Sequence, residues 1–156
     1  MKMLKYLGIG VMLLSVAALV IGVVFIAEGI MKNNLIVDRM NVEQVSLNLD
    51  PEHPDVFTPI NNGDDAQKAA DIIAEHRRSI APTYQDLLAG GRFDATNPTH
   101  LTYAQAMNLE NYLYMAVTAF GLIQVTIANG VFIVVVALAI GVVGFLLWRV
   151  SRMKFM

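Results

Sequence analysis

The sequence predicts an all-α membrane protein. We expect a two-span antiparallel transmembrane helical hairpin that carries a mostly helical extracytoplasmic domain on a long second helix. Three observations support this fold class. The 156-residue chain is 56% hydrophobic and only 15% charged, which is too apolar for an ordinary soluble domain. Two long stretches, 6–27 and 111–148, contain no charged side chain, and the two chain ends are basic around an acidic middle.

The first span follows a short basic start, residues 1–5, that contains Lys2 and Lys5. From Tyr6 to Ala27 the chain is apolar apart from Ser15, and a helix of this length measures about 33 Å, close to one bilayer core. A cleaved signal peptide is the alternative, but its apolar region is roughly 7 to 15 residues long and ends in a small-x-small site. The longer run without such a site favours a retained transmembrane helix over 6–28.

Glu28 closes this first span. We expect its carboxylate to lie at the outer interface and to reach water, as charges at the ends of membrane helices do. The alternative is a functional carboxylate inside the membrane.

The residues after the first span, 29–126, are expected to form the extracytoplasmic domain. Leu35, Ile36 and Met40 can continue the first helix. Residues 43–49 then alternate between polar and apolar, which indicates either a strand or extended loop. The prolines between 50 and 63 predict irregular chain.

Two helices are expected next. Asp64 or Asp65 can cap an amphipathic helix that ends before Pro82. Its apolar residues recur at helical spacing: Ala66, Ala69, Ala70, Ile73 and Ile80. A shorter helix around Leu87 is expected to stop at the Gly90–Gly91 pair, because glycine tolerates the left-handed conformation that ends helices.

A long final helix is expected to start at Thr102, which can form a capping box with Gln105, and to end at Trp148. At about 70 Å it is far longer than a bilayer core. We therefore place the second transmembrane helix at 127–148 and leave the outer part, from residue 102, outside the membrane. The alternative is a break at Asn129–Gly130 that makes two short membrane helices.

The outer part of this helix is apolar on nearly every side, and such a helix is normally buried. Either the outer domain wraps it, or neighbouring copies or another subunit cover it. The residues expected to contact an oligomer neighbour or partner are Met115, Phe120, Leu122 and Ile123.

The charge distribution predicts the orientation. Residues 32–112 hold six Lys or Arg and twelve Asp or Glu, whereas the tail, 149–156, holds Arg149, Arg152 and Lys154. Because basic residues that flank membrane spans stay in the cytoplasm, we expect both termini to be cytoplasmic, with the central loop outside the plasma (inner) membrane.

Small residues recur every seven positions in both spans, which predicts a helix-packing seam with a gentle left-handed crossing. They are Gly8, Ser15, Gly22 and Gly29 in the first span, and Gly130, Ala137 and Gly144 in the second. The alternative is chance, since glycine and alanine are common in membrane helices.

Three polar residues lie near the outer end of the second span: Gln124, Thr126 and Asn129. Either they sit at the interface, where water satisfies them, or they line a pore or hydrogen-bond between helices.

No motif indicates catalysis, a cofactor or a metal. His53, His76 and His100 lack metal-site spacing and are expected to be solvated loop residues. Arg77–Arg78 is too small a basic patch for nucleic acid. The expected partners are the lipid bilayer and either further copies or a larger membrane complex. We therefore predict a structural or accessory membrane subunit rather than an enzyme, with a homo-oligomeric channel, lined by the second span, as the alternative.

Overall fold

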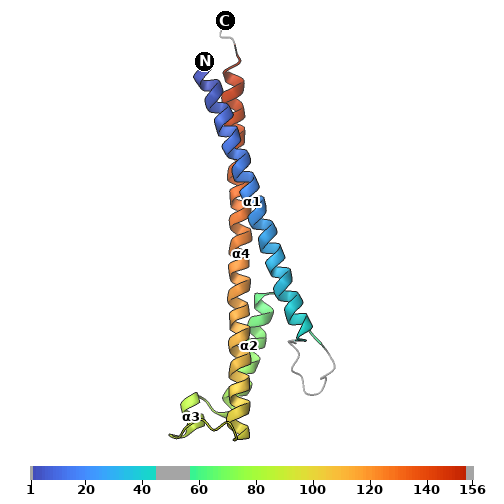
Figure 1. Cartoon of the computed structure of the whole chain (residues 1–156), viewed down its shortest axis with the longest axis vertical. Helices are drawn as coiled ribbons and strands as arrows, with labels where there is room; N and C mark the ends of the chain where they lie inside the picture. Colours follow the sequence, from blue (N-terminus) through green and yellow to red (C-terminus); the bar gives the residue numbers. More distant parts are fainter. Residues whose placement is uncertain (1, 45–56, 154–156) are drawn as a thin grey trace. The chain divides into compact units, whose positions relative to one another are not determined.

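Four helices form the part of the chain that the computed structural model describes, residues 2–44 and 57–153. They are α1 (Lys2–Val42), α2 (Gly63–Ile80), α3 (Tyr84–Leu88) and α4 (Pro98–Val150), and no strand occurs in these ranges (Figure 1). The chain divides into two compact units. Unit 1 is Met1–Lys32 with Ile123–Met156, and unit 2 is Asn33–Leu122.

Both α1 and α4 are long and apolar enough to cross a membrane. α4 is one continuous helix through Asn129 and Gly130, so the alternative with two short membrane helices is wrong. Glycine weakens a helix only modestly, and Gly130 is here buried against α1.

α4 begins four residues earlier than expected. The Asn97 side chain accepts a hydrogen bond from the Thr99 N–H at 2.9 Å, and Pro98 occupies the first helical position, where its missing N–H and fixed φ are suitable. Thr102 is therefore inside the helix and donates its hydroxyl to the Pro98 carbonyl at 2.9 Å. The expected capping box at Thr102 is wrong, because an asparagine–proline pair upstream starts the helix.

The N-cap of α2 lies two residues before Asp64, the earlier of the two expected caps. Asn62 is the N-cap, and its side-chain oxygen accepts from the Asp65 N–H at 2.9 Å. The Asp65 carboxylate accepts from the Asn62 amide at 2.8 Å, so the two side chains satisfy the helix start together. The helix ends at Ile80, before Pro82 as expected.

α3 ends with two residues in the left-handed region. Ala89 has φ 46° and Gly90 has φ 79°, so the turn begins one residue before the glycine pair that was expected to stop the helix. The Thr83 hydroxyl caps the start of α3 by accepting from the Asp86 N–H.

Unit 2 has its own core. The alanines of α2 form a small, flat face that lets α4 approach closely, and the end of α1 packs against the same cluster. The core consists of Ile60, Ala66, Ala69, Ala70, Leu113, Ala116 and Phe120, with Ile36, Val37 and Met40 packed against it. A second, smaller cluster joins Ala81, Leu87 and Tyr103.

Two sequence expectations fall outside the described residues. The possible strand over 43–49 lies there except for Glu43 and Gln44, which form a turn. His53 and most of the proline-rich stretch lie there as well.

Candidate functional site

The seven small residues of the expected seam line one buried strip in unit 1. They are Gly8, Ser15, Gly22 and Gly29 of α1, and Gly130, Ala137 and Gly144 of α4. Their contacts run in opposite directions along the two helices: Gly8 lies against Gly144, and Gly22 lies against Gly130. α1 and α4 are therefore antiparallel neighbours in this unit, in one constant register (Figure 1).

The backbones approach so closely that no side chain fits between them. A methyl group added to Gly22 would lie 2.8 Å from the Gly130 carbonyl oxygen and 2.8 Å from a Val134 methyl. A methyl group added to Gly8 would lie 2.7 Å from the backbone nitrogen of Trp148. By contrast, a methyl group added to Gly10 would meet nothing within 4 Å. The seam glycines thus permit close helix packing, which is the main source of association energy for helices in lipid.

Ser15 is the one hydroxyl in the seam. Its Oγ donates a buried hydrogen bond to the Ala137 carbonyl oxygen at 2.7 Å. A methyl group added to Gly141 would lie 2.6 Å from that Oγ, so this glycine makes room for the bond. Such interhelical hydrogen bonds contribute about 0.6 kcal/mol on average in membranes.

Charged side chains lie at the two ends of unit 1. At one end, where Gly8 contacts the backbone of Trp148, four basic residues are exposed: Lys2, Lys5, Arg149 and Arg152. At the other end, Gly29 lies against Ile127, and the neighbouring Glu28 is exposed. Between these ends both helices are free of charge.

The four expected partner contacts divide into two groups. Phe120 is 2% exposed and belongs to the core of unit 2, and Ile123 is 9% exposed. Met115 and Leu122 are 66% and 65% exposed. The chain's own residues cover Phe120 and Ile123, so of the four expected contacts only Met115 and Leu122 are available to a partner. Tyr112, also on α4, is 61% exposed.

The three expected interfacial polar residues, Glu28, Gln124 and Asn129, are all exposed. Thr126, by contrast, is partly buried. Gln124 and Asn129 thus present amide groups on the outside of the helix pair within otherwise apolar sequence.

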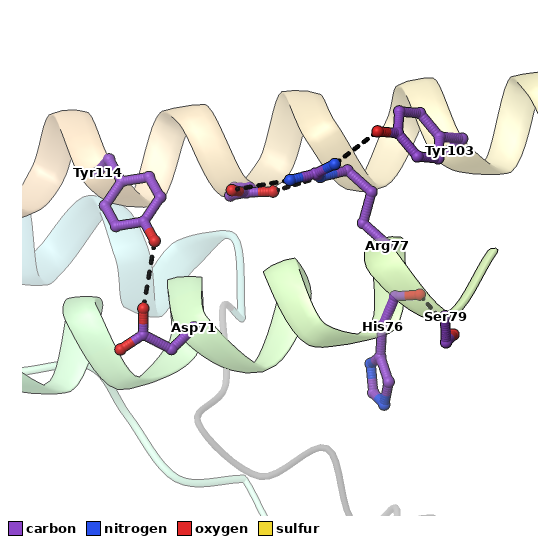
Figure 2. A network of polar contacts seen from close by, with 7 residues as sticks. Asp71, His76, Arg77, Ser79, Tyr103 and Tyr114 are labelled. Atoms are coloured by element: carbon purple, nitrogen blue, oxygen red, sulfur yellow. Dashed lines mark hydrogen bonds and ion pairs between the residues drawn. The ribbon is translucent and has the colours of Figure 1, made fainter. Parts of the chain in front are cut away.

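A polar network joins α2 to α4 in unit 2 (Figure 2). Arg77 Nε donates to Glu110 Oε2 at 2.6 Å, and its NH1 donates to the Tyr103 hydroxyl at 2.6 Å. The Arg77 guanidinium also lies 5.1 Å from the centroid of the Tyr103 ring. The two charged side chains are only 12% and 10% exposed.

The hydrogen bonds of Arg77 favour its charged form. The hydrogen bond to Glu110 raises the pKa of Arg77, against desolvation that lowers it. The sequence indicates Arg77 only as part of a small basic patch. The pairing could not be read from spacing, because Arg77 and Glu110 are 33 residues apart and meet only when α2 packs on α4.

A second contact lies along the same two helices. The Tyr114 hydroxyl donates to Asp71 at 3.2 Å (Figure 2). Desolvation, together with the hydrogen bond to the carboxylate, raises the pKa of Tyr114.

The two described histidines have different surroundings. His76 lies exposed on α2 and points away from α4 (Figure 2), so it is a helix residue rather than a loop residue. His100 lies in the first turn of α4 and is partly buried, so it too is a helix residue rather than a solvated loop residue. Its Nδ1 accepts from the Asp94 N–H at 3.0 Å, and its ring stacks on Phe93. Within the ranges 2–44 and 57–153, no group of three or more His, Cys, Asp or Glu side chains could hold a metal ion.

No known protein family matches the chain, and no curated protein or solved structure is significantly similar to it.

Proposed function

We propose that this protein is a small two-span membrane subunit that self-assembles or joins a larger membrane complex. α1 and α4 would cross the membrane as an antiparallel hairpin, with both termini in the cytoplasm and the central residues outside the plasma membrane. The observation that carries the assembly proposal is the exposure of Tyr112 and Met115, 61% and 66%, on α4 in unit 2.

The membrane placement rests on the charge-free band of unit 1. On α1 this band runs from Tyr6 to Ala27, about 33 Å as a helix and close to the thickness of the hydrocarbon core. The antiparallel register brings the basic ends of both helices together, as expected for the cytoplasmic side. Every backbone group within the band is satisfied inside a helix, as lipid requires.

The partner surface lies outside that band. Unit 2 covers one face of α4 with its own core, in which Leu113 and Ala116 are buried. Tyr112 and Met115 lie on the face of α4 that the core does not cover. Aromatic and methionine side chains are enriched in the cores of protein interfaces, and burying such a side chain gains about 1.5 to 3 kcal/mol. A second copy or a larger subunit that packs on this face would supply that burial.

Cysteine crosslinking tests the proposal, since the chain contains no native cysteine. Met115→Cys in native membranes, treated with a crosslinker that joins its thiol to a nearby amine, is expected to form an adduct, either a dimer of this chain or a complex with a larger protein. Glu75→Cys is the matched control, because Glu75 is exposed on α2, away from the proposed surface. If Met115→Cys remains monomeric after crosslinking, as the control does, the partner surface is wrong.

A channel is the alternative, favoured by one observation. Gln124 and Asn129 expose amides on α4 beside and within the second span, where polar side chains are costly unless they meet water or another helix. Copies arranged around these amides would form a polar constriction. Planar-bilayer recording separates the alternatives: a gated current supports a channel, and assembly without conductance supports a structural subunit.

A further inference from the structure

We propose that the shared end of α1 and α4 binds the headgroup of an anionic phospholipid, in the leaflet on which both chain termini lie. This inference rests on the membrane insertion proposed above. To the proposed function it adds a class of ligand, anionic phospholipids, and the residues of both helices that bind it.

The register of the two helices brings the basic residues together. Met12 packs directly on Gly144, whose added methyl group would lie 2.9 Å from the Met12 Cγ. One heptad further toward the end, the equivalent positions are Lys5 on α1 and Ser151 just after α4. Lys5 therefore lies on the side of α1 that faces the end of α4, and Lys2 lies one turn further out.

The end of α4 holds a second cation in a defined position. The Arg152 guanidinium lies 4.3 Å from the centroid of the Trp148 ring, and Ser151 Oγ donates to the Trp148 carbonyl at 2.6 Å. Tryptophan prefers the membrane interface, so the stacked guanidinium is held at headgroup level. A guanidinium can bind a phosphate through two parallel hydrogen bonds.

The positive charge at this end has no acidic side chain beside it, because Glu28 lies at the opposite end of unit 1. Lys2, Lys5, Arg149 and Arg152 are exposed, and neither 2–27 nor 111–153 contains an acidic residue. A zwitterionic headgroup would leave this charge unbalanced, whereas a headgroup with net negative charge neutralises it. Each cation near an anionic surface is worth about a fivefold increase in binding.

The only tryptophan of the chain, Trp148, lies at the site and reports on it directly. The full-length protein is reconstituted in vesicles that contain lipid with brominated chains, which quench tryptophan fluorescence on contact. We expect brominated phosphatidylglycerol to quench Trp148 more strongly than brominated phosphatidylcholine at the same mole fraction. Raising the salt concentration should reduce the difference, because the attraction is screened.

Lys5→Gln is the decisive variant, because it removes a cation on α1 and leaves the stacked Arg152–Trp148 pair in place. It should lower the preference for phosphatidylglycerol about fivefold. Lys32→Gln removes the same charge near the opposite end of unit 1 and should leave the preference unchanged. Inorganic phosphate, compared with chloride at equal ionic strength, should also leave the preference unchanged if the ligand is a lipid.

Each other result overturns a specific claim. Equal quenching by the two lipids, or equal effects of Lys5→Gln and Lys32→Gln, contradicts the lipid site and leaves membrane insertion intact. Loss of the preference in phosphate alone would assign the site to a free anion rather than to a lipid. Absence of quenching by either lipid would contradict insertion itself, and the lipid site with it.

Discussion

Arg77 makes several polar interactions between α2 and α4. Its guanidinium joins α2 to two positions of α4, Tyr103 and Glu110. The charged pair is nearly buried, so each partner compensates for the cost of removing the other from water. Such a pair adds little stability over an apolar contact, but the loss of one partner leaves a buried charge uncompensated.

This asymmetry predicts a clear pattern of stability. Glu110→Gln should destabilise unit 2 by about 3 kcal/mol, because the Arg77 charge stays buried without its counterion. Arg77→Met combined with Glu110→Met should recover most of that loss. Thermal unfolding in detergent, followed by circular dichroism, measures both. If Glu110→Gln unfolds at the same temperature as the exposed control Glu75→Gln, the Arg77–Glu110 pair does not affect the stability of unit 2.

Asp94 provides a pH-dependent contact in the loop before α4. Its carboxylate accepts from both the hydroxyl and the N–H of Thr96, at 2.7 and 2.8 Å. These two hydrogen bonds lower the pKa of Asp94 below its ordinary value of 3.8, and the one from the Thr96 hydroxyl has the larger effect.

Because the folded pKa is lowered, the contact stabilises the loop above pH 3.8 and is lost only as the pH falls through the lowered value. NMR titration of the Asp94 carboxyl carbon should therefore show a midpoint below 3.8, and Thr96→Val should move the midpoint upward. A midpoint that Thr96→Val leaves unchanged would contradict the assigned cause.

At the scale of helices, much could be predicted from the sequence. The apolar runs indicated α1 and α4, and Pro82 marked the end of α2. The starts of α2 and α4 were missed, because asparagine side chains at Asn62 and Asn97 compete with nearby aspartate and threonine as caps, and local sequence ranks these residues similarly.

The helix-packing seam predicts a sharp difference between two glycines of α1. Gly22→Leu should force the helices apart, because the added side chain would meet the backbone of Gly130 and the Val134 side chain. We expect a loss of about 2 kcal/mol or more in thermal unfolding in detergent.

Gly10→Leu is the matched control, because an added Cβ at Gly10 meets nothing within 4 Å and leucine favours the helix over glycine. It should be neutral or slightly stabilising. Similar losses for both variants would mean that the effect comes from glycine replacement in general rather than from the seam.

At the scale of the whole molecule, composition and charge predict a membrane protein, and α1 and α4 are both long and apolar enough to cross a membrane. The pairing of Arg77 with Glu110 and the burial of Phe120 could not be predicted. Both depend on how α2 packs against α4, which is set by contacts between residues far apart in the sequence. The partner is also beyond sequence reasoning, since an exposed Met115 defines a surface and not its occupant.

The central claim is that the chain crosses the membrane twice and returns to the side on which it began. Single-cysteine variants at three exposed positions test it: Met3→Cys, Glu75→Cys and Met153→Cys. In intact cells, a membrane-impermeant maleimide should label Glu75→Cys alone, and both terminal variants should react only after permeabilisation. In intact cells, labelling of one terminus but not the other, or the same result for all three variants, would contradict the two-span hairpin. Labelling of both termini with protection of Glu75→Cys would contradict its orientation alone.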